Sequence, residues 1–352
     1  MKILILKPSS LGDVIHALPV LRLLKSHLPQ SQIYWWLDAS LAPLLEGDPD
    51  LAGVIPFQRK RWAGLARWPE MLASLRAMRA KHFDWAIDLQ GLARSGIFAW
   101  LSNAKLIVGL DNAREGSREG ARAFYDLTPP RAAPDTHAVD RYLAVLPLLN
   151  VPLHWNFEWL PSRPLIAAQI DRKWNPGPGP WIVLLPGARW DNKRWPLPNF
   201  LQLVRRMRGS TALSFVILGG DDDRPLGQTI AADNPGRCLD LTGQTSLWEM
   251  IEWLRRSRLV IANDTGPMHA AAALGRPLIA LFGPTNPRNT GPYGKPASAI
   301  QITSLPCVPC YKSTCSCNIP LACLHAITPD MVCEMARELL LAPALTSLAK
   351  ST

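Results

Sequence analysis

A strand–turn–helix–strand pattern at residues 258–287 constrains the fold of this chain more than any other segment. Residues 259–262 are a short apolar run that fits a buried parallel strand, and residues 277–282 are a second one. Between them Pro267 suits the first turn of an alanine-rich helix, and Gly275 can end it. The segment therefore predicts a βαβ unit in a parallel sheet.

The turn of this unit predicts an anion site. Asp264 or Thr265 can cap the helix, and the first helical turn leaves backbone N–H groups without partners. Gly266 lets the backbone approach a ligand closely, and His269 can face the same ligand from the first turn. A nucleotide diphosphate is the usual occupant of such a position, whereas the alternative is an ordinary βαβ unit with polar caps.

The same alternation of strand and helix runs through the chain twice. The first run covers residues 1–165 and the second covers residues 175–327, with a Pro- and Gly-rich stretch at 161–180 as the most evident linker. A chain of 352 residues is long for one core, which also favours two domains. We therefore predict an α/β protein of two Rossmann-like parallel-sheet domains that face a central cleft.

Composition narrows the class of protein. Hydrophobic residues make up 48% and charged residues 19% of the chain, as in a globular protein. No apolar run approaches the ~20 residues of a membrane helix, and residues 1–6 are too short for a signal peptide, so we expect a cytoplasmic protein. The net charge of +10 suggests an acidic partner, and 14 tryptophans suit a membrane surface unless they fill the core.

Two further strand-end loops of the second domain carry charge. Arg189 and Lys193 follow the strand expected at 181–185, and either could neutralise a diphosphate. Three aspartates that begin with Asp221 follow the next strand. They invite a Mg²⁺ or Mn²⁺ interpretation, but their position favours a helix cap and a contact to ribose hydroxyls.

Motifs along nearly the whole chain resemble one known family. Asn-Asp-Thr-Gly-Pro-Met-His at 263–269, followed by Gly-Arg-Pro-Leu-Ile-Ala-Leu-Phe-Gly-Pro-Thr-Asn-Pro at 275–287, resembles glycosyltransferase family 9, the heptosyltransferases of lipopolysaccharide core assembly. The resemblance implies a GT-B fold in which a final segment, residues 328–352, packs back on the N-terminal domain. It also implies inverting transfer from ADP-L-glycero-D-manno-heptose to a Kdo-lipid A precursor, with no cofactor required.

The resemblance assigns roles to several residues. Ser10-Leu11-Gly12-Asp13 matches the family motif Ser-x-Gly-Asp, so Asp13 would be the general base that takes the proton of the acceptor hydroxyl. The alternative is that Asp13 only caps the following helix. The stretch from Asp88 to Ser95 matches a second motif, in which Gln90 and Arg94 would hold a sugar. Lys193 belongs to a loop similar to the family's Lys-x-Trp-Pro loop. A match at 135–142 fits a helix start as well as a ligand contact.

A basic segment at 57–81 suggests an anionic glycolipid as acceptor. Arg59, Lys60 and Arg61 begin it, Trp62 and Trp68 interleave, and Glu70 is its only acid. Aromatic residues among basic ones also occur in nucleic-acid-binding proteins, but no nucleic-acid motif accompanies them here. We therefore expect an acceptor at the inner face of the cytoplasmic membrane, peripheral association with that membrane, and no nucleic acid.

Five cysteines cluster between residues 307 and 323. In a cytoplasmic chain such a cluster favours a metal or free thiols over disulfides. A structural zinc would use Cys307, Cys310, Cys315 and Cys323, although their spacing departs from paired C-x2-C knuckles and leaves Cys317 extra. The alternative is a thiol-rich loop.

Some alternatives stay open. The motifs around Gln90 and His137 lean toward transfer of the first heptose, whereas the cysteine cluster and the loop at 193–196 lean toward the second. The enzyme could also use another nucleotide sugar. A sugar-nucleotide epimerase on the same fold and a basic, zinc-bearing nucleic-acid binder are the alternatives from other classes.

Overall fold

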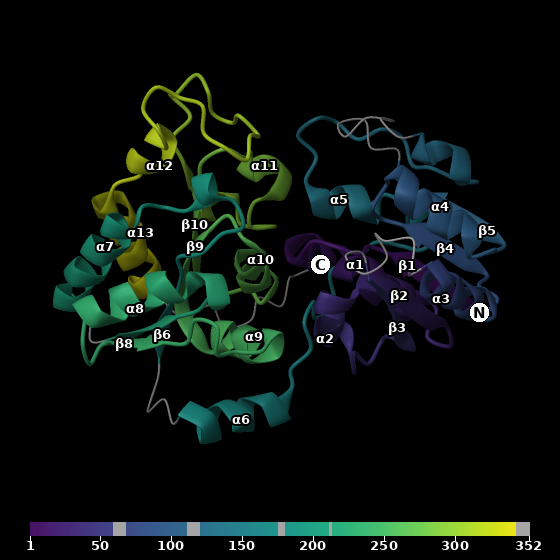
Figure 1. Cartoon of the computed structure of the whole chain (residues 1–352), viewed down its shortest axis with the longest axis horizontal. Coiled ribbons are helices and arrows are strands. Elements are labelled where there is room, and N and C mark those ends of the chain that lie inside the picture. Colours follow the sequence, from purple (N-terminus) through teal and green to yellow (C-terminus); the bar gives the residue numbers. More distant parts are fainter. Residues whose placement is uncertain (59–67, 111–119, 175–179, 211–212, 343–352) are drawn as a thin grey trace. The chain divides into compact units, whose positions relative to one another are not determined.

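The structure, a computed structural model, describes all residues except 59–67, 111–119, 175–179, 211–212 and 343–352. The chain divides into two compact units, Met1–Ser162 and Arg163–Thr352, which follow one another along the colour bar of Figure 1. Each unit is built around one parallel sheet with helices on its faces. The predicted α/β class with two parallel-sheet domains is therefore confirmed.

The sheet of the first unit has five parallel strands in the order β3-β2-β1-β4-β5. The strands are β1 (Lys2–Leu6), β2 (Gln32–Asp38), β3 (Gly53–Phe57), β4 (Trp85–Asp88) and β5 (Leu106–Gly109). The α-helices are α1 (Leu11–His27), α2 (Ala42–Leu45), α3 (Trp68–Arg79), α4 (Ala93–Leu101) and α5 (Ala138–Leu143).

The core of this unit lies between the sheet and its helices. Leu75 and Met78 of α3 and Phe98 and Ala99 of α4 pack in one apolar cluster with alternate residues of β1, so α3 and α4 cover the same sheet face. Helix α1 packs against α5. The chain runs from β1 to β2 on one side and later to β4 on the other. The carboxyl ends of β1 and β4 therefore form a topological switch point, where ligands of such sheets bind.

The sheet of the second unit has six parallel strands in the order β11-β10-β9-β6-β7-β8. The strands are β6 (Trp181–Leu185), β7 (Ser214–Ile217), β8 (Cys238–Asp240), β9 (Ser257–Asn263), β10 (Leu278–Phe282) and β11 (Ala299–Gln301). The α-helices are α6 (Pro164–Trp174), α7 (Leu197–Ser210), α8 (Arg224–Asp233), α9 (Leu247–Arg256), α10 (Gly266–Ala273), α11 (Pro287–Thr290), α12 (Ala322–His325) and α13 (Pro329–Leu341). Its switch point lies between β6 and β9.

Helix α6 occupies part of the stretch expected to be a linker. The Arg163 guanidinium lies 3.6 Å from the ring centre of Trp248, and Lys173 pairs with Glu249 at 3.3 Å. Ile170 is fully buried. These contacts attach the helix to α9, so the units divide between Ser162 and Arg163, and the second begins earlier than the predicted residue 175.

Helix α13 packs in the core of the second unit, and the expected contact of segment 328–352 with the N-terminal domain stays a prediction. Val332, Cys333 and Ala336 of α13 are buried in the core of the second unit, and the helix contacts α7, β9 and β10. Asp330 at its start forms an ion pair with Arg206 of α7. The apolar stripe of α13 therefore completes the core of its own unit. Residues 343–352 lie outside the described residues.

Candidate active site

A cavity of about 670 Å³ opens at the carboxyl end of the second sheet. The loops that follow β6, β7 and β9 form its walls together with the start of α9. Its lining includes Arg189, Arg194, Asp221, Ser246 and Thr265. The cavity therefore lies at the switch point of this sheet, where the sequence predicts a nucleotide.

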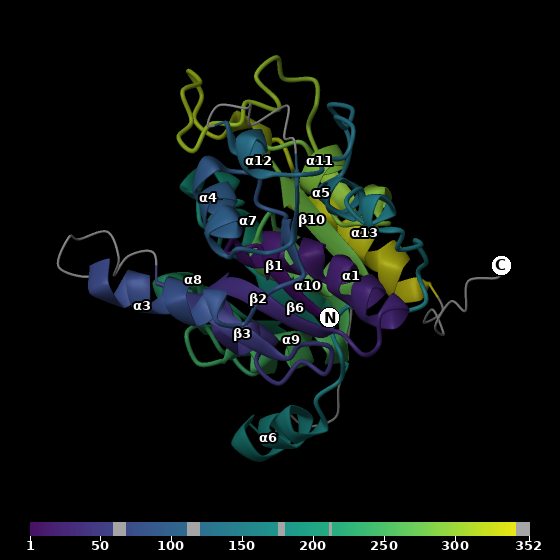
Figure 2. The same cartoon turned by 90° about the vertical axis from the view of Figure 1, so that its right-hand side faces the viewer.

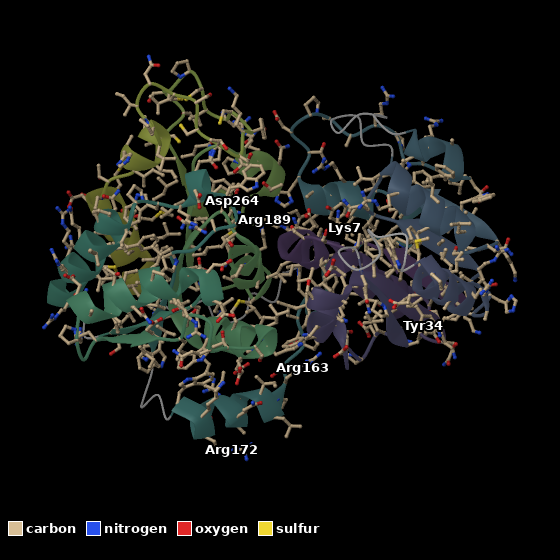
Figure 3. All side chains as sticks on the ribbon, in the orientation of Figure 1. Lys7, Tyr34, Arg163, Arg172, Arg189 and Asp264 are labelled. Atoms are coloured by element: carbon tan, nitrogen blue, oxygen red, sulfur yellow. The ribbon has the colours of Figure 1, made fainter. Side chains whose placement is uncertain are left out.

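Arginine side chains and the start of helix α10 line this cavity. The exposed Arg189 side chain comes from the loop after β6 and is labelled in Figure 3. Arg194 lines the same cavity, donates to the Ala188 carbonyl at 2.9 Å and pairs with Asp191 at 3.1 Å. Thr265 is the N-cap of α10, so the amide groups of that helix start at the cavity wall. This arrangement suits a diphosphate.

Lys193 and Asp264, both predicted donor-site residues, are paired with each other. The Lys193 Nζ donates to Asp264 Oδ2 at 2.6 Å, and the Thr285 hydroxyl donates to the same oxygen at 2.5 Å. The two residues do not line the cavity, and neither do Gly266 and His269, which lie in the first turn of α10. The ion pair therefore connects the loop after β6 to the loop between β9 and α10, and it lies outside the cavity lining.

The three aspartates after β7 have different surroundings. Asp221 accepts from the Arg224 guanidinium at 2.8 Å, while Asp223 accepts from the Gly220 amide at 2.9 Å. The Asp223 carboxylate sits against the backbone of Gly187, where any Cβ would clash with it. Asp222 is exposed and has no hydrogen-bond partner within the described part of the chain. All three line the cavity, so Asp222 presents the most available carboxylate.

Asn263, the last residue of β9, holds both ends of the loop between β6 and α7, a role that could not be predicted from the sequence. Its side chain is fully buried, accepts from the Trp195 amide at 3.0 Å and donates to the Pro186 carbonyl at 2.7 Å. The Trp195 indole in turn donates to the Ile327 carbonyl at 2.8 Å. The residue stands in the motif at 263–269, but only the folded chain shows which loop it holds.

Asp13, the predicted general base, lies in the first turn of α1 at the edge of the first sheet. Its Oδ2 accepts from the Ser10 amide at 2.9 Å and from the Ser10 hydroxyl at 2.7 Å, so it does cap the helix. Its Oδ1 accepts from the Tyr142 hydroxyl at 3.2 Å. The helix cap therefore uses Oδ2 and the contact with Tyr142 uses Oδ1, while the role of Asp13 as general base stays a prediction.

Two further contacts link the start of the first unit to α5. The Lys7 ammonium lies 4.7 Å from the ring centre of Tyr142. The rings of His16 and His137 are 5.1 Å apart, and His137 caps α5 by accepting from the Val139 amide at 3.2 Å. Tyr142 falls within the motif at 135–142, whose interpretation as a helix start is confirmed.

The loop after β4 brings Gln90 and Arg94 to the same sheet edge as Asp13, because β4 is the neighbour of β1. The buried Asp88 organises this loop by accepting from the Gln90 amide at 2.8 Å and from the Tyr125 hydroxyl at 2.7 Å. Burial raises the pKa of the Asp88 carboxyl above its ordinary value. Gln90 is half-buried and Arg94 is exposed at the start of α4.

The predicted acceptor residues Arg59, Lys60 and Arg61 lie outside the described residues. Their assignment therefore stays a prediction.

The predicted zinc ligands surround one small apolar cavity of about 20 Å³. It is lined by Cys307, Cys310, Cys315, Cys317 and Cys323, and the Sγ atoms of Cys307 and Cys317 are 3.4 Å apart. Within the described ranges, no three His, Cys, Asp or Glu side chains are placed so as to hold a metal ion. As arranged, the thiols do not fit a zinc site, and the zinc assignment remains a prediction from the sequence.

Comparison with known proteins identifies the family. Residues 71–319 match the model of glycosyltransferase family 9 (heptosyltransferase). Lipopolysaccharide heptosyltransferase 1 of Pseudomonas aeruginosa is 33% identical, over 97% of this chain and 99% of that protein.

Two solved structures are similar over the whole fold. The E. coli ADP-heptose lps heptosyltransferase II has a TM-score of 0.77 and 25% identity, with 97% of this chain and 99% of that chain covered. The E. coli heptosyltransferase WaaC with ADP has a TM-score of 0.74 and 26% identity, with 96% of this chain and all of that chain covered. The family decides against the epimerase and the nucleic-acid binder. The chain belongs to glycosyltransferase family 9, the heptosyltransferase family, and is a glycosyltransferase.

Proposed function

We propose that this enzyme transfers a heptose, with inversion, from ADP-L-glycero-D-manno-heptose to the inner core of a lipopolysaccharide precursor. The observation that carries the proposal is the cavity at the switch point of the second sheet, with Arg189 and the start of α10 in its walls. The relatives support the sugar and the acceptor, because the names of two of them contain ADP-heptose and lipopolysaccharide.

The donor is held by the second unit. Its diphosphate lies against the N–H groups of α10 and near Arg189, which together balance the negative charge that grows on ADP as it leaves. The Asp222 carboxylate accepts hydrogen bonds from the ribose hydroxyls. Asp221 can take this role only if its hydrogen bond with the Arg224 guanidinium breaks. Because these groups already supply positive charge, we propose that transfer requires no divalent ion.

Asp13 acts on the acceptor. The acceptor hydroxyl oxygen attacks C1 of the heptose, its proton passes to Asp13, and the bond between C1 and the phosphate oxygen breaks with release of ADP. Attack from the face opposite the leaving group inverts the configuration at C1. Ser10 and Tyr142 hold the carboxylate in one orientation, so its proton-accepting oxygen is positioned before the acceptor arrives. Gln90 and Arg94 bind the acceptor sugars.

The acceptor is part of a lipid, so we propose that the enzyme works as a peripheral protein at the inner face of the cytoplasmic membrane. No helix within the described ranges is long and apolar enough to cross a membrane. Contact with the bilayer must then come from surface side chains. Arg59, Lys60 and Arg61 supply positive charge toward the phosphates of the acceptor.

The test is incubation with ADP-heptose and two acceptors, one that ends in Kdo and one that already carries the first heptose. Mass spectrometry of the products separates transfer of the first heptose from transfer of the second, and the anomeric configuration of the product tests inversion. Parallel reactions in EDTA test metal independence. If neither acceptor gains a heptose while another nucleotide sugar is consumed, the donor assignment is wrong.

A further inference from the structure

Two helices of the first unit expose large apolar side chains on one surface. Leu72 of α3 is 43% exposed, and Ile97 and Trp100 of α4 are 41% and 59% exposed. Both helices cover the same sheet face, and they lie on the same side of the unit in Figures 1 and 2. Their outward faces therefore form one surface that folding leaves in contact with water.

The spacing of the exposed residues places each set on one helix face. On α3, Leu72, Arg76 and Arg79 are four and three residues apart, and all three are exposed. On α4, Ile97 and Trp100 are three residues apart. Here we call Leu72, Arg76, Arg79, Ile97 and Trp100 the α3–α4 surface.

The charge of the α3–α4 surface is positive. Within the described ranges, Arg76 and Arg79 have no carboxylate partner. The acids nearest in the sequence are Glu70 in the first turn of α3 and Asp84, which pairs with Lys105 at 2.7 Å. Arginine contacts lipid phosphates well, and tryptophan prefers the headgroup level of a bilayer.

We propose that the α3–α4 surface is where the enzyme rests on an anionic phospholipid bilayer. The inference rests on the proposed function, in which the acceptor is anchored in a membrane. Trp100, Ile97 and Leu72 would enter the interface, while Arg76 and Arg79 would contact phosphate groups. An anionic bilayer complements the charge of the two arginines, and its headgroup level suits the exposed tryptophan and aliphatic side chains.

The surface is continuous with the candidate acceptor site. Helix α4 begins in the loop that carries Gln90, and its exposed stripe runs from Arg94 to Ile97 and Trp100. Six residues of helix span about 9 Å. Trp100 therefore lies about 9 Å along the helix from Arg94, a candidate acceptor residue, which suits an acceptor whose lipid stays in the membrane.

The experiment is co-flotation of the full-length protein with vesicles, without donor or acceptor. Vesicles of phosphatidylcholine alone are compared with vesicles that also contain phosphatidylglycerol. The test variant is Ile97→Ser with Trp100→Ser. The matched control is Leu153→Ser with Trp155→Ser, which removes an aliphatic and a tryptophan that are 49% and 42% exposed elsewhere on the same unit.

We expect the wild type and the control to float with anionic vesicles and the test variant to lose roughly tenfold or more of its partition coefficient. Arg76→Ser with Arg79→Ser should lose about fivefold per arginine on anionic vesicles and nothing on neutral ones. Melting temperature and ADP binding, measured on every variant, identify a variant that failed to fold. If the Ile97→Ser, Trp100→Ser variant fails to fold, the milder single substitution Trp100→Tyr takes its place.

Three outcomes would overturn the proposal. The first is equal flotation of the test variant and the wild type, and the second is a loss of flotation confined to the control variant. The third is a light-scattering result in which the wild type is a dimer and the test variant is a monomer, because this would assign the surface to a second copy of the chain. Transfer to a short acceptor in solution separates this inference from the proposed function, because the test variant should keep that activity even when it no longer binds vesicles.

Discussion

Lys193 and Asp264, 71 residues apart in the sequence, form a 2.6 Å ion pair in which the Asp264 side chain is only 5% exposed. Lys193→Ala would leave a buried carboxylate without its cation. We expect the free energy of unfolding to fall by about 2 kcal/mol, below the value for a fully buried pair because Lys193 is partly exposed. ADP affinity should fall as well, because the pair supports the loop before α10. The double variant Lys193→Ala with Asp264→Asn should lose less stability than the two single variants together, and strict additivity in urea titrations would contradict the coupling.

Asp13→Asn should fold normally, bind ADP and lose about a hundredfold or more of its turnover, the scale for losing a general base. Tyr142→Phe should cost less, because it only removes one hydrogen bond to the carboxylate. The measurement is single-turnover kinetics across pH, with circular dichroism as the check on folding. An Asp13→Asn enzyme with near-wild-type turnover would leave Asp13 with its capping role alone.

Gly187→Ala should narrow the donor cavity. The added Cβ would clash with the Asp223 carboxylate, which must then move toward the space that the nucleotide needs. If the displaced carboxylate costs ADP binding about 1.4 kcal/mol, ADP affinity should fall by roughly tenfold in calorimetry. The control is Gly209→Ala in α7, where the Cβ meets nothing within 4 Å. The control should bind ADP as the wild type does, and an equal loss in both variants would disprove the clash.

The thiols of the cysteine cluster should react at different rates. The Leu321 amide donates to Cys315 Sγ and lowers the pKa of that thiol, whereas the hydrogen bond to Cys307 raises the pKa of Cys317 to about 11. The thiolate is the reactive form, so Cys315 should be alkylated faster at pH 8, with the difference shrinking toward pH 11. Peptide mass spectrometry after timed iodoacetamide treatment measures both. Uniform protection of the cluster together with one equivalent of zinc would instead support the metal prediction.

Replacement of Arg59, Lys60 and Arg61 by Ser should raise the acceptor KM by at least about tenfold at low ionic strength and leave ADP affinity unchanged. Salt should reduce the difference from the wild type, because screening weakens the interaction of the intact segment. Steady-state kinetics with a phosphorylated acceptor over a salt series measure this. Unchanged acceptor kinetics at low salt would place the acceptor phosphates elsewhere.

The periodic features of the sequence were enough to predict the sheets. Apolar runs such as 259–262 and 277–282 are buried strands in the structure, and the helix between them starts and ends close to its predicted caps. Local signals carry this information, because strand burial and helix capping depend on residues near one another in the chain. The same local signals predicted that Asp13 and Arg189 follow the carboxyl ends of strands, as they do in the structure.

Long-range partners could not be predicted. Nothing in the sequence shows that Lys193 would pair with Asp264, or that Asn263 would hold Trp195. Helix α6 was not predicted, because its proline- and glycine-containing stretch indicated a linker and its contacts with α9 join segments far apart in the sequence. These arrangements depend on register and topology, which arise only when distant segments meet.

Helix α6 packs on α9, and α13 packs on α7, β9 and β10, so both helices must be kept when this half of the enzyme is exchanged with that of a relative. A fragment that spans residues 175–327 would expose the faces that Ile170 and Val332 cover. Recombination between relatives of different donor preference should therefore join chains at 162/163 and retain α13. Crossovers placed after α6, at residues 175–180, would separate this helix from α9, with which it shares ion pairs.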